Sequence, residues 1–258
     1  MKKIASLSFF VTLASLATAQ QPSANRPTLV AGFPVNYSED SVGSYTLPDL
    51  LQCADGQRVT TAKLWEKKRR PELLKLIEEI QFGKMPPRPL DLSFQVFDKG
   101  TPAFNGKAIR KQVTVYFTKD TSDHKMNLLI YLPAAAQKPV PLLMNISFAA
   151  YNQIIDDTGL VVGNIWNREG KTVKADKPTV FGKMNVEQFL DAGIGFATVY
   201  YGDIEPDFKE GIKYGIRKQY LKPGQTETAP DEWGAISAWA WGLSRAMDYF
   251  QVDKQIDS

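Results

Sequence analysis

Two stretches of the chain carry apolar residues at helical spacing. Within residues 231–250 an apolar residue recurs every three or four positions, the spacing of an amphipathic helix. The positions are Trp233, Ile236, Ala240, Leu243, Met247 and Phe250. Asp231 stands where the N-cap of this helix belongs. We therefore predict a helix over residues 231–250 that buries this stripe against a sheet.

A second apolar stripe lies nearer the amino terminus, at Leu73, Leu74, Ile77 and Ile80. It predicts a helix that Thr60 or Thr61 starts, with Pro71 in a first turn, where its missing N–H is not needed. Gly83 is expected to end this helix.

Strand patterns fill the region between these helices. Three segments are rich in β-branched and aromatic residues and partly alternate: residues 92–97, 110–117 and 126–132. Thr101-Pro102 and Lys119-Asp120 predict the turns between them. Residues 140–148 are more continuously apolar, a pattern typical of a strand buried on both faces of a parallel sheet.

A short helix over residues 186–192, ended by Gly193, is predicted before another apolar strand at residues 194–201. The order strand, helix, strand, helix predicts an α/β fold with antiparallel strands at one edge of the sheet.

The first residues have the pattern of a secretory signal peptide. Lys2 and Lys3 precede an apolar stretch over residues 4–16, and the small residues Ala17-Thr18-Ala19 predict cleavage after Ala19. This apolar stretch is shorter than the ~20 residues that a membrane span needs, and no later segment approaches that length. The prediction is an exported protein, with residues 20–46 as an extended arm and residues 47–258 as one domain.

Charge and cysteine content narrow the class of protein. A formal net charge of +3, which includes both lysines of the leader, gives no electrostatic case for nucleic-acid binding. Cys53 is the only cysteine, so we expect no internal disulfide and a buried, inert thiol. One cysteine and one histidine cannot form a closed zinc site, and we predict no metal and no cofactor.

Two residues resemble members of a catalytic triad without fitting its context. Ser244 lies in Gly-Leu-Ser-Arg-Ala, but a nucleophile elbow needs a strand before its serine, and here a helical pattern surrounds it. His124, the only histidine, lies in a polar turn and precedes any such serine in the chain, whereas in α/β-hydrolases the histidine comes last. We expect Ser244 to be an ordinary helix residue and His124 an exposed turn residue.

Candidate substrate-cleft residues follow two of the predicted strands. Ser147 and Phe148 end the apolar strand of residues 140–148, and Asp203 follows the strand of residues 194–201. Loops at the carboxyl ends of parallel strands line ligand sites in α/β folds. A calcium loop beginning at Asp203 is disfavoured, because Phe208 and Tyr214 occupy the positions of its required glycine and glutamate.

Several longer stretches are specific enough to suggest a family. They are ADGQRVTT (residues 54–61), RRPE (69–72), YLP (131–133), VYYGDIEPD (199–207) and EWGA (232–235). In this order the chain resembles the bacterial glucuronoyl esterases and their acetylxylan-esterase-like relatives. The resemblance covers residues 47–257.

This resemblance implies a secreted α/β-hydrolase with a Ser-His-acid triad. Such an enzyme cleaves the ester between glucuronic acid on xylan and an alcohol on lignin, or a similar carbohydrate ester. The family's Gly-x-Ser-Arg-x-Gly-Lys motif does not occur in the sequence, so no catalytic role carries over to any residue of this chain. We expect an incomplete α/β-hydrolase sandwich that stops before the nucleophile strand and is inactive by itself.

A different class of function stays open. The chain is alternatively a non-catalytic exported protein that binds carbohydrate or another partner. That reading has to explain how an interrupted parallel sheet protects its open edge and the apolar faces of its helices from water.

Overall fold

The computed structural model describes residues 27–30, 32–122, 124–167 and 169–257. The predicted leader and its cleavage site at Ala19 lie outside these residues. Contacts divide the chain into two units, one up to Leu50 and one from Leu51 onward. In the first unit, β1 (Leu29–Val30) pairs antiparallel with β2 (Phe33–Pro34), and a 3-10 turn spans Glu39–Val42. None of its described residues is buried.

The second unit begins with a long helical segment, residues 62–82, called here the helical arm. It comprises α1 (Ala62–Leu64), a π-helical turn (Trp65–Arg69), α2 (Arg70–Ile77) and a second π-helical turn (Glu78–Phe82). Thr61 caps it, because its Oγ1 accepts the Leu64 N–H at 3.2 Å. Pro71 lies in the first turn of α2 as predicted, but helical winding also precedes it.

Gly83 ends the helical arm, as the sequence predicts, and brings it to the amino end of α5 (Ala235–Phe250). Its φ of 74° favours glycine, and a Cβ there would lie 2.2 Å from the backbone oxygen of Glu232. The Phe82 carbonyl accepts hydrogen bonds from the Gly234 N–H and the Ser237 hydroxyl, at 3.1 and 2.7 Å.

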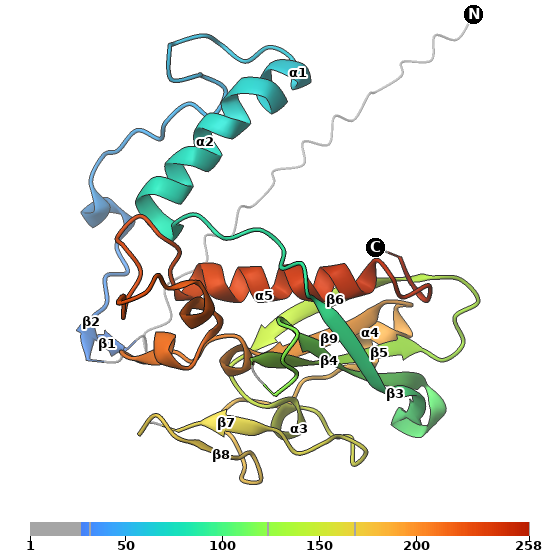
Figure 1. Ribbon diagram of the computed structural model, residues 1–258. Coiled ribbons are helices and arrows are strands. Elements are labelled where there is room, and N and C mark those ends of the chain that lie inside the picture. The colour runs from blue at the N-terminus through green and yellow to red at the C-terminus, as the bar shows by residue number, and fades with distance from the viewer. Residues whose placement is uncertain (1–26, 31, 123, 168, 258) are drawn as a thin grey trace, which may run out of the picture. The chain divides into compact units, whose positions relative to one another are not determined.

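A six-stranded mixed sheet forms the body of this unit, in the order β10-β6-β9-β5-β4-β3 (Figure 1). Its strands are β3 (Ser93–Ala103), β4 (Ala108–Tyr116), β5 (Lys125–Pro133), β6 (Val140–Ser147), β9 (Gly195–Tyr200) and β10 (Ile256–Asp257). Short turns connect β3, β4 and β5, which pair antiparallel, and β5 also pairs antiparallel with β9. The pairs β9–β6 and β6–β10 are parallel.

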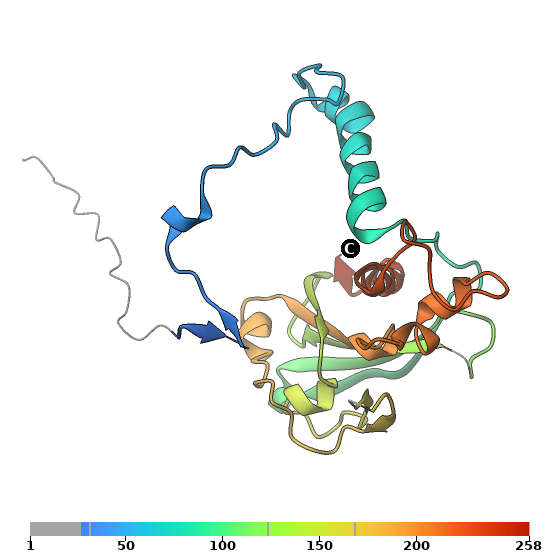
Figure 2. The same cartoon turned by 90° about the vertical axis from the view of Figure 1, so that its left-hand side faces the viewer.

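Helices cover both faces of this sheet, as Figures 1 and 2 show. On one face, α5 (Ala235–Phe250) packs Ala238, Trp241 and Phe250 against strand residues such as Leu128 and Val199. On the other face lie α3 (Tyr151–Ile154) and α4 (Glu187–Asp191). There Tyr151 and Leu190 belong to a second core with Tyr131 and Phe196. This architecture confirms the predicted α/β class.

Residues 148–186 form a long excursion between β6 and α4. Besides α3 it contains a small hairpin of β7 (Asn164–Trp166) and β8 (Thr172–Lys174), which pair antiparallel. Three 3-10 turns, Tyr201–Asp203, Gly211–Lys213 and Ile216–Tyr220, follow β9 on the way to α5.

Three local predictions need correction. Thr101-Pro102 lies inside β3, where Pro102 pairs with Ile109. Edge strands tolerate proline, and the turn lies instead at the 3-10 turn Phe104–Gly106. The cap of α5 is Gly234, since residues 231–234 form a turn before the helix. Finally, β6 is only partly buried, with Leu143 43% exposed, because the two-residue β10 pairs with its first two positions alone.

Candidate substrate-binding edge

The carboxyl ends of β6 and β9 bring the sequence-predicted residues Ser147, Phe148 and Asp203 to one edge of the sheet. The parallel register places Ser147 beside Tyr200, and both strands then turn away into loops. Phe148 and Tyr201 are the first residues after the two strands. This geometry is the one that α/β folds use for ligand sites.

Three rings meet at this edge and are called here the aromatic edge: Phe148, Tyr201 and Trp239. The ring centroids of Phe148 and Tyr201 are 4.6 Å apart, and Trp239 lies 5.7 Å from Phe148 and 5.6 Å from Tyr201. Phe148 is 47% exposed, and the other two rings are half-buried. The cluster therefore presents an apolar surface to solvent beside polar backbone.

Ser147 itself is turned inward. Its hydroxyl donates to the Ala149 carbonyl at 2.7 Å and accepts the Ala149 N–H at 3.1 Å, so it closes the turn that begins the excursion. The side chain is buried. In the structure the Ser147 side chain fixes the direction in which the backbone leaves β6 at Phe148.

Asp203 ends the 3-10 turn that begins at Tyr201 of the aromatic edge. Its Oδ2 accepts hydrogen bonds from the backbone N–H and the side-chain amide of Asn127, at 3.0 and 3.3 Å. Burial of the carboxyl raises its pKa to about 6, and the two Asn127 hydrogen bonds only partly oppose this effect. A carboxyl whose pKa is raised by burial near exposed aromatic rings is the kind of group that functional sites collect.

The β7–β8 hairpin also contributes to this edge, which the sequence did not predict. The Trp166 N–H donates to the Tyr200 hydroxyl at 3.0 Å, and its indole Nε1 donates to the Gly202 carbonyl at 3.1 Å. Burial raises the pKa of Tyr200 above its ordinary value, so its hydroxyl stays protonated. Trp166 thus ties the excursion to the backbone between Tyr201 and Asp203.

A buried ion pair holds the third ring in place. Arg217 Nε donates to Glu205 Oε1 at 2.7 Å, and Glu205 is 1% exposed. The Glu205 carbonyl in turn accepts the Trp239 indole N–H at 2.8 Å.

Among the described residues, no group of three or more His, Cys, Asp and Glu side chains is arranged to hold a metal ion.

The two triad-like residues occupy unrelated places. Ser244 lies in α5 and donates its hydroxyl to the Ala240 carbonyl at 3.0 Å, which confirms it as a helix residue. His124 is half-buried rather than exposed, because its ring stacks on Phe117 and its Nε2 lies 2.8 Å from the Ile204 carbonyl oxygen. Next to Ser244, Arg245 pairs with Asp248 at 2.6 Å.

Comparison with known proteins gives a match to one protein sequence and matches to solved structures. No protein-family model matches the chain. A carbohydrate esterase, MZ0003, from an unknown prokaryotic organism is 40% identical over 230 residues, which are 86% of this chain and 53% of that protein.

Solved structures agree with this match. A glucuronoyl esterase from Solibacter usitatus is 45% identical with a TM-score of 0.78, over 85% of this chain and 57% of that one. A promiscuous CE15 esterase from a marine bacterial metagenome is 38% identical with a TM-score of 0.71, over 86% and 57%. The chain thus spans about half the length of the relatives it matches.

Fold and edge together define the chain as part of the α/β-hydrolase class. Within that class it belongs to the family of bacterial glucuronoyl esterases and their acetylxylan-esterase-like relatives. Among the described residues, no helix is both long and apolar enough to cross a membrane.

Proposed function

We propose that this chain is the amino-terminal portion of a secreted serine-type carboxylic ester hydrolase that acts on plant cell-wall carbohydrate esters, either glucuronoyl esters or acetylated xylan. The observation that carries the proposal is the aromatic edge, which lies at the carboxyl ends of β6 and β9 in a chain that is 45% identical to a glucuronoyl esterase.

The aromatic edge suits a sugar ring. Carbohydrate sites pair apolar and aromatic surfaces with a few placed polar groups, and Phe148 offers an exposed ring beside the polar backbone of the turn at Ser147. In the α/β-hydrolase fold a loop in this position supplies a backbone N–H to the oxyanion hole. We therefore assign Phe148 to contact with the substrate, and Ser147 and Asp203 to fixing the two strand ends that line the same substrate-binding edge.

The same chain is proposed to be inactive as an esterase by itself. A serine nucleophile needs a histidine base within hydrogen-bond reach. The one histidine, His124, instead stacks on Phe117 and contacts the Ile204 carbonyl, while the Ser244 hydroxyl is bonded inside α5.

The ring contacts of the aromatic edge also favour a second candidate function, carbohydrate binding without hydrolysis. The aromatic edge is formed entirely by residues of this chain, so it needs no other polypeptide to present its rings. On this reading the chain is an exported binding protein.

Calorimetric titration with a xylo-oligosaccharide that carries a methyl glucuronate group tests both candidates. We expect binding that Phe148→Ala weakens roughly tenfold, as loss of a stacked aromatic contact of ~1–1.5 kcal/mol predicts. Phe181→Ala is the matched control, since Phe181 is an exposed ring of the excursion without a ring contact at the aromatic edge. Equal effects of both variants would argue against the assigned edge.

Chromatography of the same mixtures, together with acetylated xylan, tests the inactivity that both candidate functions share. Release of methanol or acetate by the chain would contradict the proposed inactivity. For export, expression with the leader should give a product whose mass corresponds to cleavage after Ala19; an exported product that keeps residues 1–19 would contradict this.

A further inference from the structure

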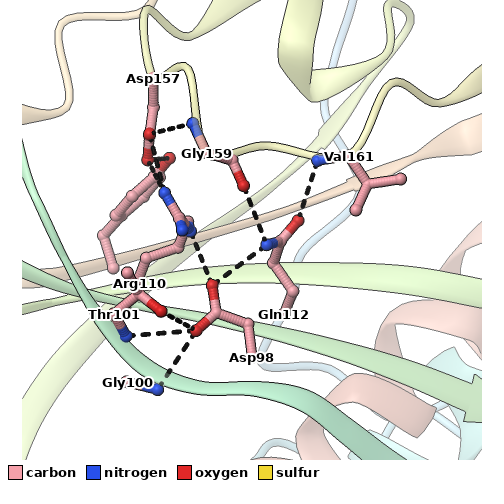
Figure 3. A network of polar contacts seen from close by, with 9 residues as sticks. Asp98, Gly100, Thr101, Arg110, Gln112, Asp157, Gly159 and Val161 are labelled. Carbon is pink, nitrogen blue, oxygen red and sulfur yellow. Dashed lines mark hydrogen bonds and ion pairs between the residues drawn. The ribbon is translucent and has the colours of Figure 1, made fainter.

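A buried polar network that includes none of the rings of the aromatic edge is centred on Arg110 of β4, and Figure 3 shows it from close by. Arg110 Nε donates to Asp98 Oδ2 at 2.7 Å. Its Nη1 donates to both carboxylate oxygens of Asp157, at 2.8 and 2.9 Å. All three side chains are less than a tenth exposed. One cation thus bridges a carboxylate of the edge strand β3 and a carboxylate of the excursion.

Neutral groups complete the network. Gln112 Nε2 donates to Asp98 Oδ2 at 3.1 Å and to the Gly159 carbonyl at 3.4 Å, while its Oε1 accepts the Val161 N–H at 3.3 Å. The Tyr131 hydroxyl donates to Asp157 Oδ2 at 2.8 Å. Three alternate residues of one loop, Asp157, Gly159 and Val161, are therefore fixed to the sheet by polar contacts (Figure 3).

The network leaves almost no space around the guanidinium. A Cβ at Gly159 would lie 2.0 Å from Arg110 Nη1. Burial opposes the charge of Asp157, yet the hydrogen bonds from Arg110 keep its pKa below the ordinary value. Buried ion pairs add little net stability compared with apolar replacements, but they select one arrangement of the groups that they join.

A continuous series of contacts leads from this loop to the aromatic edge. After Val161, the Gly163 N–H donates to Asn152 Oδ1 at 3.0 Å, and Asn152 Nδ2 donates to the Ala175 carbonyl at 2.7 Å. These two bonds frame the β7–β8 hairpin. Trp166 of the hairpin then donates from its N–H and Nε1 to the Tyr200 hydroxyl and the Gly202 carbonyl, and the Tyr200 ring lies 4.9 Å from the ring of Tyr201 in the aromatic edge.

We propose that Arg110 is a positioning residue for the substrate-binding edge: by holding Asp157 and the loop around it, its guanidinium fixes the excursion and so the place where Trp166 meets the strand ends. The effect on ligand binding rests on the proposed function. The effect on the excursion does not.

Gly159→Ala is the sharpest variant, because it displaces the guanidinium without removing any charge or donor. Gly182→Ala is its matched control, since this glycine lies in the same excursion and a Cβ there meets nothing within 4 Å. Asp157→Asn provides a second perturbation with little change of volume, in case Gly159→Ala does not fold.

Hydrogen–deuterium exchange of the full chain is the first measurement. We expect Gly159→Ala and Asp157→Asn to raise exchange roughly tenfold in residues 155–166, as loss of a charged hydrogen bond predicts, with β4 and β5 unchanged. Gly182→Ala should leave both regions unchanged. Unchanged exchange in residues 155–166 overturns the proposal, and so does a rise spread over the whole sheet, which marks a merely structural role.

Titration with the methyl-glucuronate xylo-oligosaccharide is the second measurement. If the unaltered chain binds it, both variants should weaken binding several-fold at a temperature where each variant is still folded. Unchanged affinity despite faster exchange overturns the assignment to the edge. If the unaltered chain binds no oligosaccharide, the proposed function fails, and the exchange result still decides whether Arg110 positions the excursion.

Discussion

Individual buried carboxylates of this chain have different partners. Asp98, Asp157 and Glu205 each contact an arginine, whereas the Oδ2 of Asp203 accepts its hydrogen bonds from Asn127. Amide donors compensate a buried charge less well than a cation does, and burial accordingly raises the pKa of Asp203 to about 6. The ionised form of Asp203 is therefore a source of instability at neutral pH.

The pH dependence of unfolding tests this account. The folded-state pKa of Asp203 lies above its ordinary value of 3.8, so the folded chain holds this proton more tightly than the unfolded chain. The contribution of the neutral acid is complete below pH 4 and is lost as pH rises through about 6. We expect Asp203→Asn to unfold like the unaltered chain near pH 4, and to be more stable by roughly 3 kcal/mol at pH 7.

Urea unfolding at pH values from 4 to 7 measures the difference. Asp207→Asn is the control, because Asp207 lies in the same loop and is exposed, so its substitution should leave the pH profile unchanged. A difference between Asp203→Asn and the unaltered chain that does not vary with pH would contradict the account.

Elements pack closely where a glycine removes a side chain. In α5, Gly242 faces the loop after β9, and a Cβ there would lie 2.4 Å from Ile204 Cδ1. Alanine is the better helix former by ~1 kcal/mol, but overpacking a core costs ~1–3 kcal/mol. We expect Gly242→Ala to lower the free energy of unfolding by ~1–2 kcal/mol and to disturb the Ile204 contact with His124.

Urea unfolding checks this expectation with Ser244→Ala as the control in the same helix. The Ser244 hydroxyl bonds only within α5, so its loss should change stability by less than ~0.5 kcal/mol. If Gly242→Ala is as stable as Ser244→Ala, the prediction is contradicted, because α5 and the loop after β9 would then have room for the added methyl group.

Sequence periodicity predicted these elements because it records which face of a segment is buried. The strands β4, β5 and β9 and the existence of helix α5 followed from local spacing alone. The predicted apolar stripe of α5 was wrong as a buried face, because Ile236, Ala240 and Met247 are exposed, and the helix instead buries residues such as Ala238, Trp241 and Ala246. Periodicity could not predict that β9 lies between β6 and β5, since strand order depends on contacts between residues far apart in the chain. Pro102 shows a local signal that failed. Its pairing with Ile109 keeps it in the edge strand β3, although Thr101-Pro102 is typical of a turn.

The candidate site shows the same division. Ser147, Phe148 and Asp203 were predictable, since ligand sites follow the ends of parallel strands. Trp166 was not, because its hydrogen bond to the Tyr200 hydroxyl joins residues that are 34 positions apart. Trp239 was assigned to no site, because a helical pattern does not show which ring lies at the end of the sheet.

At the scale of the whole unit from Leu51 onward, much apolar surface stays exposed. The helical arm contains no buried residue, and Leu76 and Ile80 are 51% and 76% exposed. Of the predicted stripe, Phe250 in α5 and Trp233 just before it are buried. Ile236 and Met247, also in α5, are more than two-fifths exposed. Each large side chain left in water forgoes roughly 1.5–3 kcal/mol, so contiguous surfaces of this kind favour association.

We therefore expect the isolated chain to bind an apolar fluorescent dye and to self-associate in sedimentation experiments. The double variant Leu76→Gln and Ile80→Gln should reduce both signals and change the free energy of unfolding by less than ~0.5 kcal/mol, because neither side chain packs in a core. Val180→Gln is the control, since Val180 is a fully exposed apolar residue outside the helical arm. If the control lowers dye binding and association as much as the double variant, isolated apolar residues rather than the helical arm cause the association. A monodisperse chain that binds no dye would contradict the whole account, because it would mean that the arm and the open side of α5 are covered in solution.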